Sequence, residues 1–126
     1  MGGFVRGAII VAAILASLAV TRGAYAAEPL YEKKLIRLAE VLGAIHSLRN
    51  LCGERSDDWR NQMDALILAE NPDPERKARL IASFNRGYRS FSESYSTCTD
   101  SAIAAINLYM KEGERLSSEI VTGYGN

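Results

Sequence analysis

The sequence has few of the residues from which most catalytic and metal sites are built, with one histidine, two cysteines and one tryptophan. A zinc site needs three or four ligands. The di-iron pattern of helical bundles needs Glu-x-x-His on two helices, whereas Gly43 stands three residues before His46. An axial pair of His46 with Met63 or Met110 could hold a haem, but no covalent attachment motif accompanies it. We therefore expect no metal, no cofactor, and a histidine that is partly buried and hydrogen-bonded.

The sequence also has no excess of either charge, with 15 basic and 15 acidic residues. Arg6 and Arg22 lie in the amino-terminal segment, and without them 13 bases face 15 acids, a net charge of −2. Nucleic-acid binding relies on basic side chains that contact phosphates. We therefore expect no nucleic-acid partner.

Long apolar runs are missing except near the amino end, where residues 7–20 form an uncharged run of 14 residues. One positive charge precedes this run, and a small-x-small triplet that ends at Ala26 follows it. This is the layout of a cleavable secretory signal. A retained membrane anchor is the alternative, although a spanning helix needs about 17–25 apolar residues. We predict a signal peptide over residues 1–26 and a single periplasmic domain over residues 27–126.

The two cysteines, Cys52 and Cys98, occur without a C-x-x-C motif or a haem-attachment sequence. An even number of cysteines in an exported protein favours a disulfide, and a redox pair or metal ligands are the alternatives. The disulfide would close a loop of 47 residues, which the chain-entropy model values at about 4 kcal/mol. Because such a domain is stabilised by only about 5–15 kcal/mol in total, this is a large share.

Apolar residues recur every three or four positions through residues 27–126, which is the period of helices with one buried face. No β-type alternation of useful length and no internal repeat is present. Polar residues suited to capping precede the last three helices, namely Ser56 or Asp57, then Asp73, then Thr99 or Asp100. The pattern predicts four helices: Pro29 to Cys52, ended by Gly53; residues 58–70; Pro74 towards Thr97; and about residue 100 to the tail that begins at Gly123.

Short connections between these helices favour antiparallel neighbours. Cys52, at the end of the first helix, and Cys98, after the third, would then lie at the same end. Helical period and cysteine position are independent observations, and their agreement predicts a small all-α, up-down bundle of about four helices with one disulfide.

The third predicted helix has an aromatic side and a basic side. Its apolar side spans about 100° of arc and is expected to be core; it contains Leu80, Ile81, Phe84, Tyr88, Phe91, Tyr95 and Cys98. Arg79, Arg86 and Arg89 lie opposite. The ordinary explanation is a solvated face, with Arg89 and Glu93 spaced for a weak ion pair. The functional alternative is docking on an anionic partner.

Arg49 lies near the middle of the first helix's apolar face, one turn before Cys52. A buried guanidinium needs an acidic or carbonyl partner, and Asp57, Asp58 or Asp100 could supply one. We expect an internal ion pair beside the disulfide, with a ligand clamp as the alternative.

Gly43 and Gly87 stand inside predicted helices, where each costs about 1 kcal/mol relative to alanine. Close helix–helix approach is the simplest reason to retain them. Both are expected to face a neighbouring helix or to lie beside the core.

Five stretches are distinctive when taken together: LGAIHSLRNLCG (42–53), WRNQM (59–63), FNRGYR (84–89), YSTCT (95–99) and EGERL (112–116). In this combination the chain resembles a family of short exported alphaproteobacterial proteins labelled conserved hypothetical, of unknown function. The resemblance covers nearly all of residues 27–126. It implies an alphaproteobacterial source, export and one domain, and it transfers no activity or catalytic residue.

We expect a protein-binding or adaptor module of the cell envelope, whose partner is another envelope protein or an anionic envelope component. Its expected contact surfaces are the basic side with Arg79, Arg86 and Arg89, and the disulfide end around Arg49, Trp59 and Arg60.

The main alternative is a small-ligand carrier, which would need a pocket between helices lined by Tyr88, Phe91 or Tyr95. An enzyme ranks third and would need His46 or two carboxylates to converge in a cleft. The sequence gives no reason to select any of the candidate acids Glu40, Glu70 and Glu112.

Overall fold

A computed structural model describes residues 22–124, with side chains described from residue 29 to residue 123. The predicted signal peptide lies outside the described residues except for its last five, and the predicted cleavage after Ala26 is not tested. Residues 1–31 and 32–126 form two units, which are treated separately below. The described residues form four helices and no strand: α2 (Arg22–Leu51), α3 (Asp58–Glu70), α4 (Pro74–Ser92) and α5 (Asp100–Tyr124).

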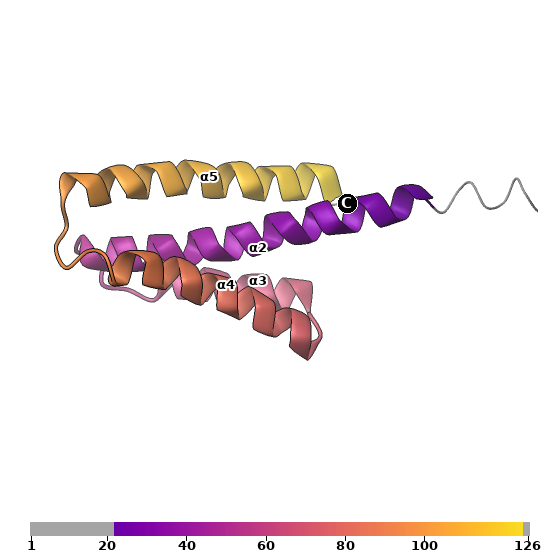
Figure 1. The fold of residues 1–126 in the computed structure, drawn as a ribbon, viewed down its shortest axis with the longest axis horizontal. Helices are drawn as coiled ribbons and strands as arrows, with labels where there is room; N and C mark the ends of the chain where they lie inside the picture. Colours follow the sequence, from indigo (N-terminus) through magenta and orange to yellow (C-terminus); the bar gives the residue numbers. More distant parts are fainter. Residues whose placement is uncertain (1–21, 125–126) are drawn as a thin grey trace, which may run out of the picture. The chain divides into compact units, whose positions relative to one another are not determined.

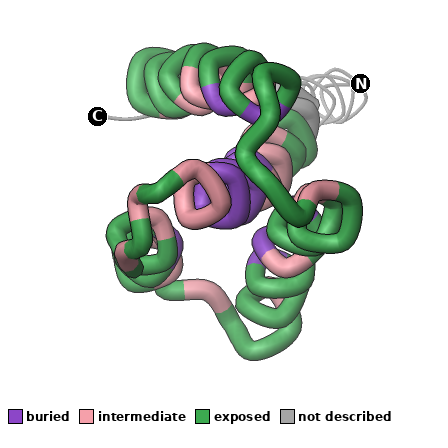
Figure 2. Tube along the Cα trace, turned by 90° about the vertical axis from the view of Figure 1, so that its left-hand side faces the viewer, coloured by how far each residue is buried: buried purple, intermediate pink, exposed green. Residues whose placement is uncertain are grey.

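Successive helices of the unit of residues 32–126 run in opposite directions (Figure 1), which confirms the predicted up-down bundle. The centre of this bundle is α2, since residues 41–48 are buried without interruption. A helix that is buried all round belongs in a core, and Figure 2 shows the buried residues gathered there with the other three helices around it. The largest fully buried side chains are Leu35, Val41, Ile45, Leu48 and Leu80.

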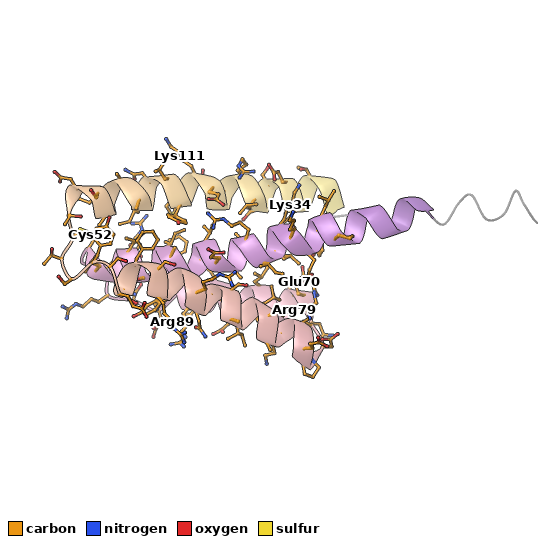
Figure 3. All side chains as sticks on the ribbon, viewed as in Figure 1. Lys34, Cys52, Glu70, Arg79, Arg89 and Lys111 are labelled. Carbon is orange, nitrogen blue, oxygen red and sulfur yellow. A yellow bond between two sulfur atoms is a disulfide. The ribbon has the colours of Figure 1, made fainter. Side chains whose placement is uncertain are left out.

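The disulfide between Cys52 and Cys98 is present, with 4.9 Å between the two Cα atoms. Figure 3 shows Cys52 at the opposite end of this unit from Glu70. A small cluster of Leu48, Ala102 and Ile106 packs beside the disulfide. The prediction that one end of the bundle is stapled is therefore confirmed.

Two helix boundaries differ from the prediction. In the unit of residues 1–31, α2 already begins at Arg22, so that Pro29 lies inside it. Alanine and glutamate just before Pro29 are strong helix formers, and the proline removes only one amide donor. In the other unit α4 ends at Ser92, because the serines and threonine of residues 92–97 compete for backbone hydrogen bonds. Tyr95 and Cys98 therefore follow the helix instead of extending its stripe.

The helix caps are partly as predicted. The Asp73 carboxylate accepts a hydrogen bond from the Arg76 amide at 2.8 Å, and the Thr99 hydroxyl accepts one from the Ala102 amide at 3.1 Å. Asp57 makes no capping hydrogen bond through its side chain. At the far end, α5 continues through Gly123 to Tyr124, so Gly123 does not end it as expected.

Close contact between α2 and α4 explains both internal glycines. A Cβ atom on Gly43 would overlap the carbonyl oxygen of Phe84, and one on Gly87 would overlap the carbonyl oxygen of Glu40. The two contacts are reciprocal, since each glycine meets the residue three positions before the other. The expected close approach is confirmed, and it fixes how α4 lies against α2.

Candidate functional site

Three spaces separate the helices that surround α2, and they differ in chemistry. Ion pairs bridge the helices on the side where α4 and α5 meet α2. A polar pocket lies among α2, α3 and α4, and an apolar groove lies among α2, α3 and α5. These last two are the candidate binding sites.

A chain of four charged side chains joins α5, α2 and α4. Arg37 donates hydrogen bonds to both carboxylate oxygens of Glu112, one at 2.8 Å, and lies 3.2 Å from Glu40. Glu40 in turn pairs with Arg86 at 3.2 Å. The hydrogen bonds from Arg37 hold the pKa of the Glu112 carboxyl below its usual range. This network acts as a structural tie between the helices.

The predicted basic surface of α4 is largely occupied by intramolecular contacts. Arg79 pairs with Glu75 at 3.3 Å, and Arg86 pairs with Glu40. Arg89 has no ion pair with a described residue and lies on the outer side of α4 (Figure 3). The expected pair of Arg89 with Glu93 does not form. Of these three arginines, Arg89 is thus the one that forms no ion pair with a described residue.

The three candidate catalytic acids are also engaged in ion pairs. Glu40 and Glu112 belong to the network described above. Glu70 of α3 contacts Arg76 at 3.1 Å, and Arg76 also binds Glu32 of α2 at 2.8 Å. These carboxylates bind helices together.

Arg49 forms the expected ion pair beside the disulfide, but with a different acid. Its Nη1 lies 3.0 Å from Glu54 Oε2, and its guanidinium lies 5.9 Å from the centre of the Trp59 ring. Asp57, Asp58 and Asp100 are not its partners. The left-handed Gly53 (φ 104°) turns the chain so that the Glu54 amide bonds the Arg49 carbonyl at 2.9 Å, which brings the acid back over the helix end.

The polar pocket has a volume of about 240 Å³ and is lined by His46, Arg60, Phe84, Asn85 and Tyr88. His46 is only 8% exposed, and its ring lies 5.9 Å from that of Phe84 and 5.6 Å from that of Tyr88. None of the lining residues is an acid. Of the three aromatic residues expected to line the pocket of a carrier, Tyr88 lines this pocket, while Phe91 and Tyr95 pack beside the disulfide instead.

The hydrogen bonds around His46 define its neutral form. Asn50 Oδ1 accepts from the Ser56 amide at 3.0 Å, so its amide nitrogen is the atom 3.1 Å from His46 Nδ1. Since that nitrogen is a donor, Nδ1 accepts and the ring proton lies on Nε2. Burial lowers the pKa of His46, the charge of Arg60 lowers it further, and Asp57 opposes them. His46 is accordingly a neutral donor through Nε2.

The apolar groove is larger, with a volume of about 400 Å³. Trp59 of α3 forms one wall, Met110 of α5 the other, and Leu38 and Ile45 of α2 the floor; Gly113, Glu114 and Ser117 complete the lining. The Trp59 indole nitrogen is buried and has no hydrogen-bond partner among the described residues. Because positions 113 and 117 of α5 carry small residues, no bulky side chain fills the groove there.

The structure thus keeps Arg49 and Trp59 in contact at the disulfide end but places Arg60 in the polar pocket. Trp59 belongs to the apolar groove, Arg60 to the polar pocket, and Arg49 to the ion pair. Sequence reasoning missed Asn50 and Asn85. Asn85 directly precedes Arg86 on α4, and no periodic pattern in the sequence singles it out. Asn50 lies one turn after the only histidine of the sequence, and this spacing could have predicted their contact.

Neither candidate site has the composition of a metal centre. Nowhere among the described side chains do three or more histidine, cysteine, aspartate or glutamate residues gather closely enough to hold a metal ion. Of the helices described, none combines the length and the apolar content needed to cross a membrane.

The fold and the two cavities described above define a small disulfide-bridged helical bundle with candidate binding sites between its helices. Residues 30–124 match the model of a family described as protein of unknown function (DUF2385), and the chain belongs to that family. No curated protein and no solved structure matches the chain.

Proposed function

We propose that the protein is an exported binding module that holds an amphipathic helix of another envelope protein in the groove between α3 and α5. The apolar groove carries this proposal. Tryptophan and methionine are enriched in protein interfaces, and a groove with an apolar floor is the usual site for the apolar face of a helix. The predicted signal sequence and the disulfide support export, because disulfides persist in oxidising compartments.

The geometry of the bundle favours a helix as the occupant. The central α2 is covered by ion pairs and aromatic contacts towards α4 and α5, including Phe91 against Tyr109 with 5.4 Å between ring centres. Between α3 and α5 its side chains Leu38 and Ile45 instead form the floor of the groove. Both walls are helices, so a further helix laid between them would continue the bundle packing.

Charge and hydrogen-bonding capacity specify the partner further. Glu114 lines the groove and has no ion pair with a described residue, so the partner helix should place a lysine or arginine beside it. The indole N–H of Trp59 forms no hydrogen bond with a described residue. After a small change in ring position it could donate to the partner helix. A buried donor without a partner costs about 1–3 kcal/mol, which binding would recover.

Photo-crosslinking in living cells tests this function. Benzoylphenylalanine at Ser117, in the groove, is compared with the same residue at Leu108, which is 68% exposed and lies on the opposite side of α5 by helical period. We expect crosslinks from position 117 into an apolar-faced, basic helical segment of one envelope protein, and their loss in Glu114→Lys. Identical products from both positions, or a crosslinked segment without apolar periodicity, would reject the proposal.

A second candidate function is a carrier that binds a small ligand in the polar pocket. It is favoured by one observation, namely the enclosure of Tyr88, His46 and Arg60 around a common space of about 240 Å³. An exported protein with such a pocket could bind a small polar molecule without any catalytic group.

A further inference from the structure

The polar pocket contains hydrogen-bonding groups that the protein itself does not use. The Arg60 guanidinium, the Asn85 amide and the Tyr88 hydroxyl each line the pocket without a hydrogen bond or ion pair to another described residue. His46 carries its ring proton on Nε2, because the other ring nitrogen accepts from Asn50. This Nε2–H likewise donates to no described residue. All four groups can donate hydrogen bonds, and one of them, the Arg60 guanidinium, is also a cation.

The charge of the pocket selects the sign and the size of the ligand's charge. Arg60 is the sole ionised residue among those that line the pocket. One guanidinium balances one negative charge, and its planar pair of N–H groups matches the two oxygens of a carboxylate. A phosphate dianion would keep a second, uncompensated charge.

The walls limit the rest of the ligand. Phe84 and the ring of His46 are both buried, lie 5.9 Å apart between centres and are inclined to each other by 35°, so they present little apolar surface beside the polar groups. A volume of about 240 Å³ is roughly that of eight water molecules in the liquid. The pocket therefore suits a mostly polar ligand of about ten non-hydrogen atoms.

We propose that this pocket binds a small carboxylate, with Arg60 pairing the carboxylate, the Nε2–H of His46, Asn85 and Tyr88 donating to its oxygens, and Phe84 contacting its carbon atoms. The proposal rests on the second candidate function, and it adds the chemical class of the ligand. Hydrogen bonds to charged groups contribute about 1.5–3 kcal/mol each, so the loss of the ligand's charge should weaken binding by about tenfold or more.

Benzoate and benzamide are suitable probes because they have the same shape and differ in charge. Titration of the oxidised protein, followed by the NMR signals of His46 and Tyr88, should give saturable binding of benzoate and binding of benzamide weaker by about tenfold or more. Arg60→Gln should weaken benzoate binding to the level of benzamide. Arg89→Gln, which removes an exposed arginine outside the pocket, should leave it within about twofold.

The outcomes separate this inference from the function on which it rests. Equal binding of benzoate and benzamide would overturn the proposal of a carboxylate ligand, but it would still support the carrier function. Stronger binding of inorganic phosphate than of benzoate would also overturn it. The absence of saturable shifts at His46 and Tyr88 with every probe would reject the carrier and the carboxylate together.

Discussion

At the scale of single residues, the His46 environment is the most informative part of the molecule. Asn50 connects this histidine to the loop after α2, since its amide nitrogen lies 3.1 Å from His46 Nδ1 while its Oδ1 accepts a hydrogen bond from the Ser56 amide at 3.0 Å. Protonation of Nδ1 would place two donors against each other and break this contact. Arg60 and Asp57 act electrostatically on the ring from the α3 side, and Tyr88 faces it from α4.

The lowered pKa of His46 predicts a loss of stability on acidification. As the pH falls below about 6.5, the unfolded chain takes up a proton before the folded one does. Stability is therefore complete above this pH and falls towards the lower pKa of the folded state. Since the chain has one histidine, His46→Gln should abolish the slope in urea unfolding measured between about pH 7 and pH 5. An unchanged slope in this variant would show that another group is responsible.

The Arg37–Glu112 pair gives a second prediction at this scale. It is bidentate, but the side chains are 39% and 25% exposed, so its contribution is reduced by solvent. Glu112→Gln should lower the free energy of unfolding by about 1 kcal/mol at neutral pH. Glu114→Gln, two residues on and without an ion pair, should change it by less than about 0.5 kcal/mol. Chemical denaturation of the two variants measures the difference, and equal values would contradict it.

At the scale of helices, the contact between α2 and α4 depends on two glycines. Their replacement forces the backbones apart, because the atoms in the way are backbone carbonyls and the nearest amide nitrogens lie only 3.0 Å from the added carbon. Gly113 of α5 differs, since a Cβ there would meet only a Val41 methyl at 3.4 Å.

Gly43→Ala and Gly87→Ala should each cost about 3 kcal/mol or more in unfolding free energy. Gly113→Ala is the control and should be neutral or stabilising by up to about 1 kcal/mol, through helix propensity. Thermal unfolding of the three variants provides the measurement. A cost at Gly113 as large as at Gly43 would mean that the helices do not approach as described.

Much of the helical architecture could be predicted from the sequence, because period and caps are local signals. The span of α3 and the Asp73 cap were correct. The pairing of Cys52 with Cys98 followed from the even number of cysteines, and the short connections placed both at the same end of the bundle. The end of α4 could not be placed, since the serine-rich stretch after Ser92 keeps the helical spacing of Tyr95 and Cys98 while weakening the helix itself.

The candidate sites were only partly predictable for a different reason. Trp59 and Arg60 were assigned to one contact surface, but adjacent residues on one helix face different spaces, and only the packing of three helices shows which. The partner of Arg49 was missed because the Gly53 turn makes Glu54, five residues away, nearer than the acids of the following helix.

At the scale of the whole molecule, the disulfide ties the loop after α4 to the end of α2. Its removal in a Cys52→Ser, Cys98→Ser double variant should cost about 2–5 kcal/mol. Since a domain of this size has about 5–15 kcal/mol in total, the variant should still fold at low temperature and unfold much earlier in urea. A midpoint equal to that of the oxidised protein would show that the disulfide contributes nothing.

Both binding proposals presuppose an exported and oxidised domain of residues 27–126. Intact mass spectrometry of the protein recovered from the periplasmic fraction under non-reducing conditions tests both parts of this premise at once. The predicted result is a chain that begins at Ala27 and is lighter by two hydrogen atoms than the dithiol form. A mass that includes Met1, or a periplasmic protein with two free thiols, would contradict it.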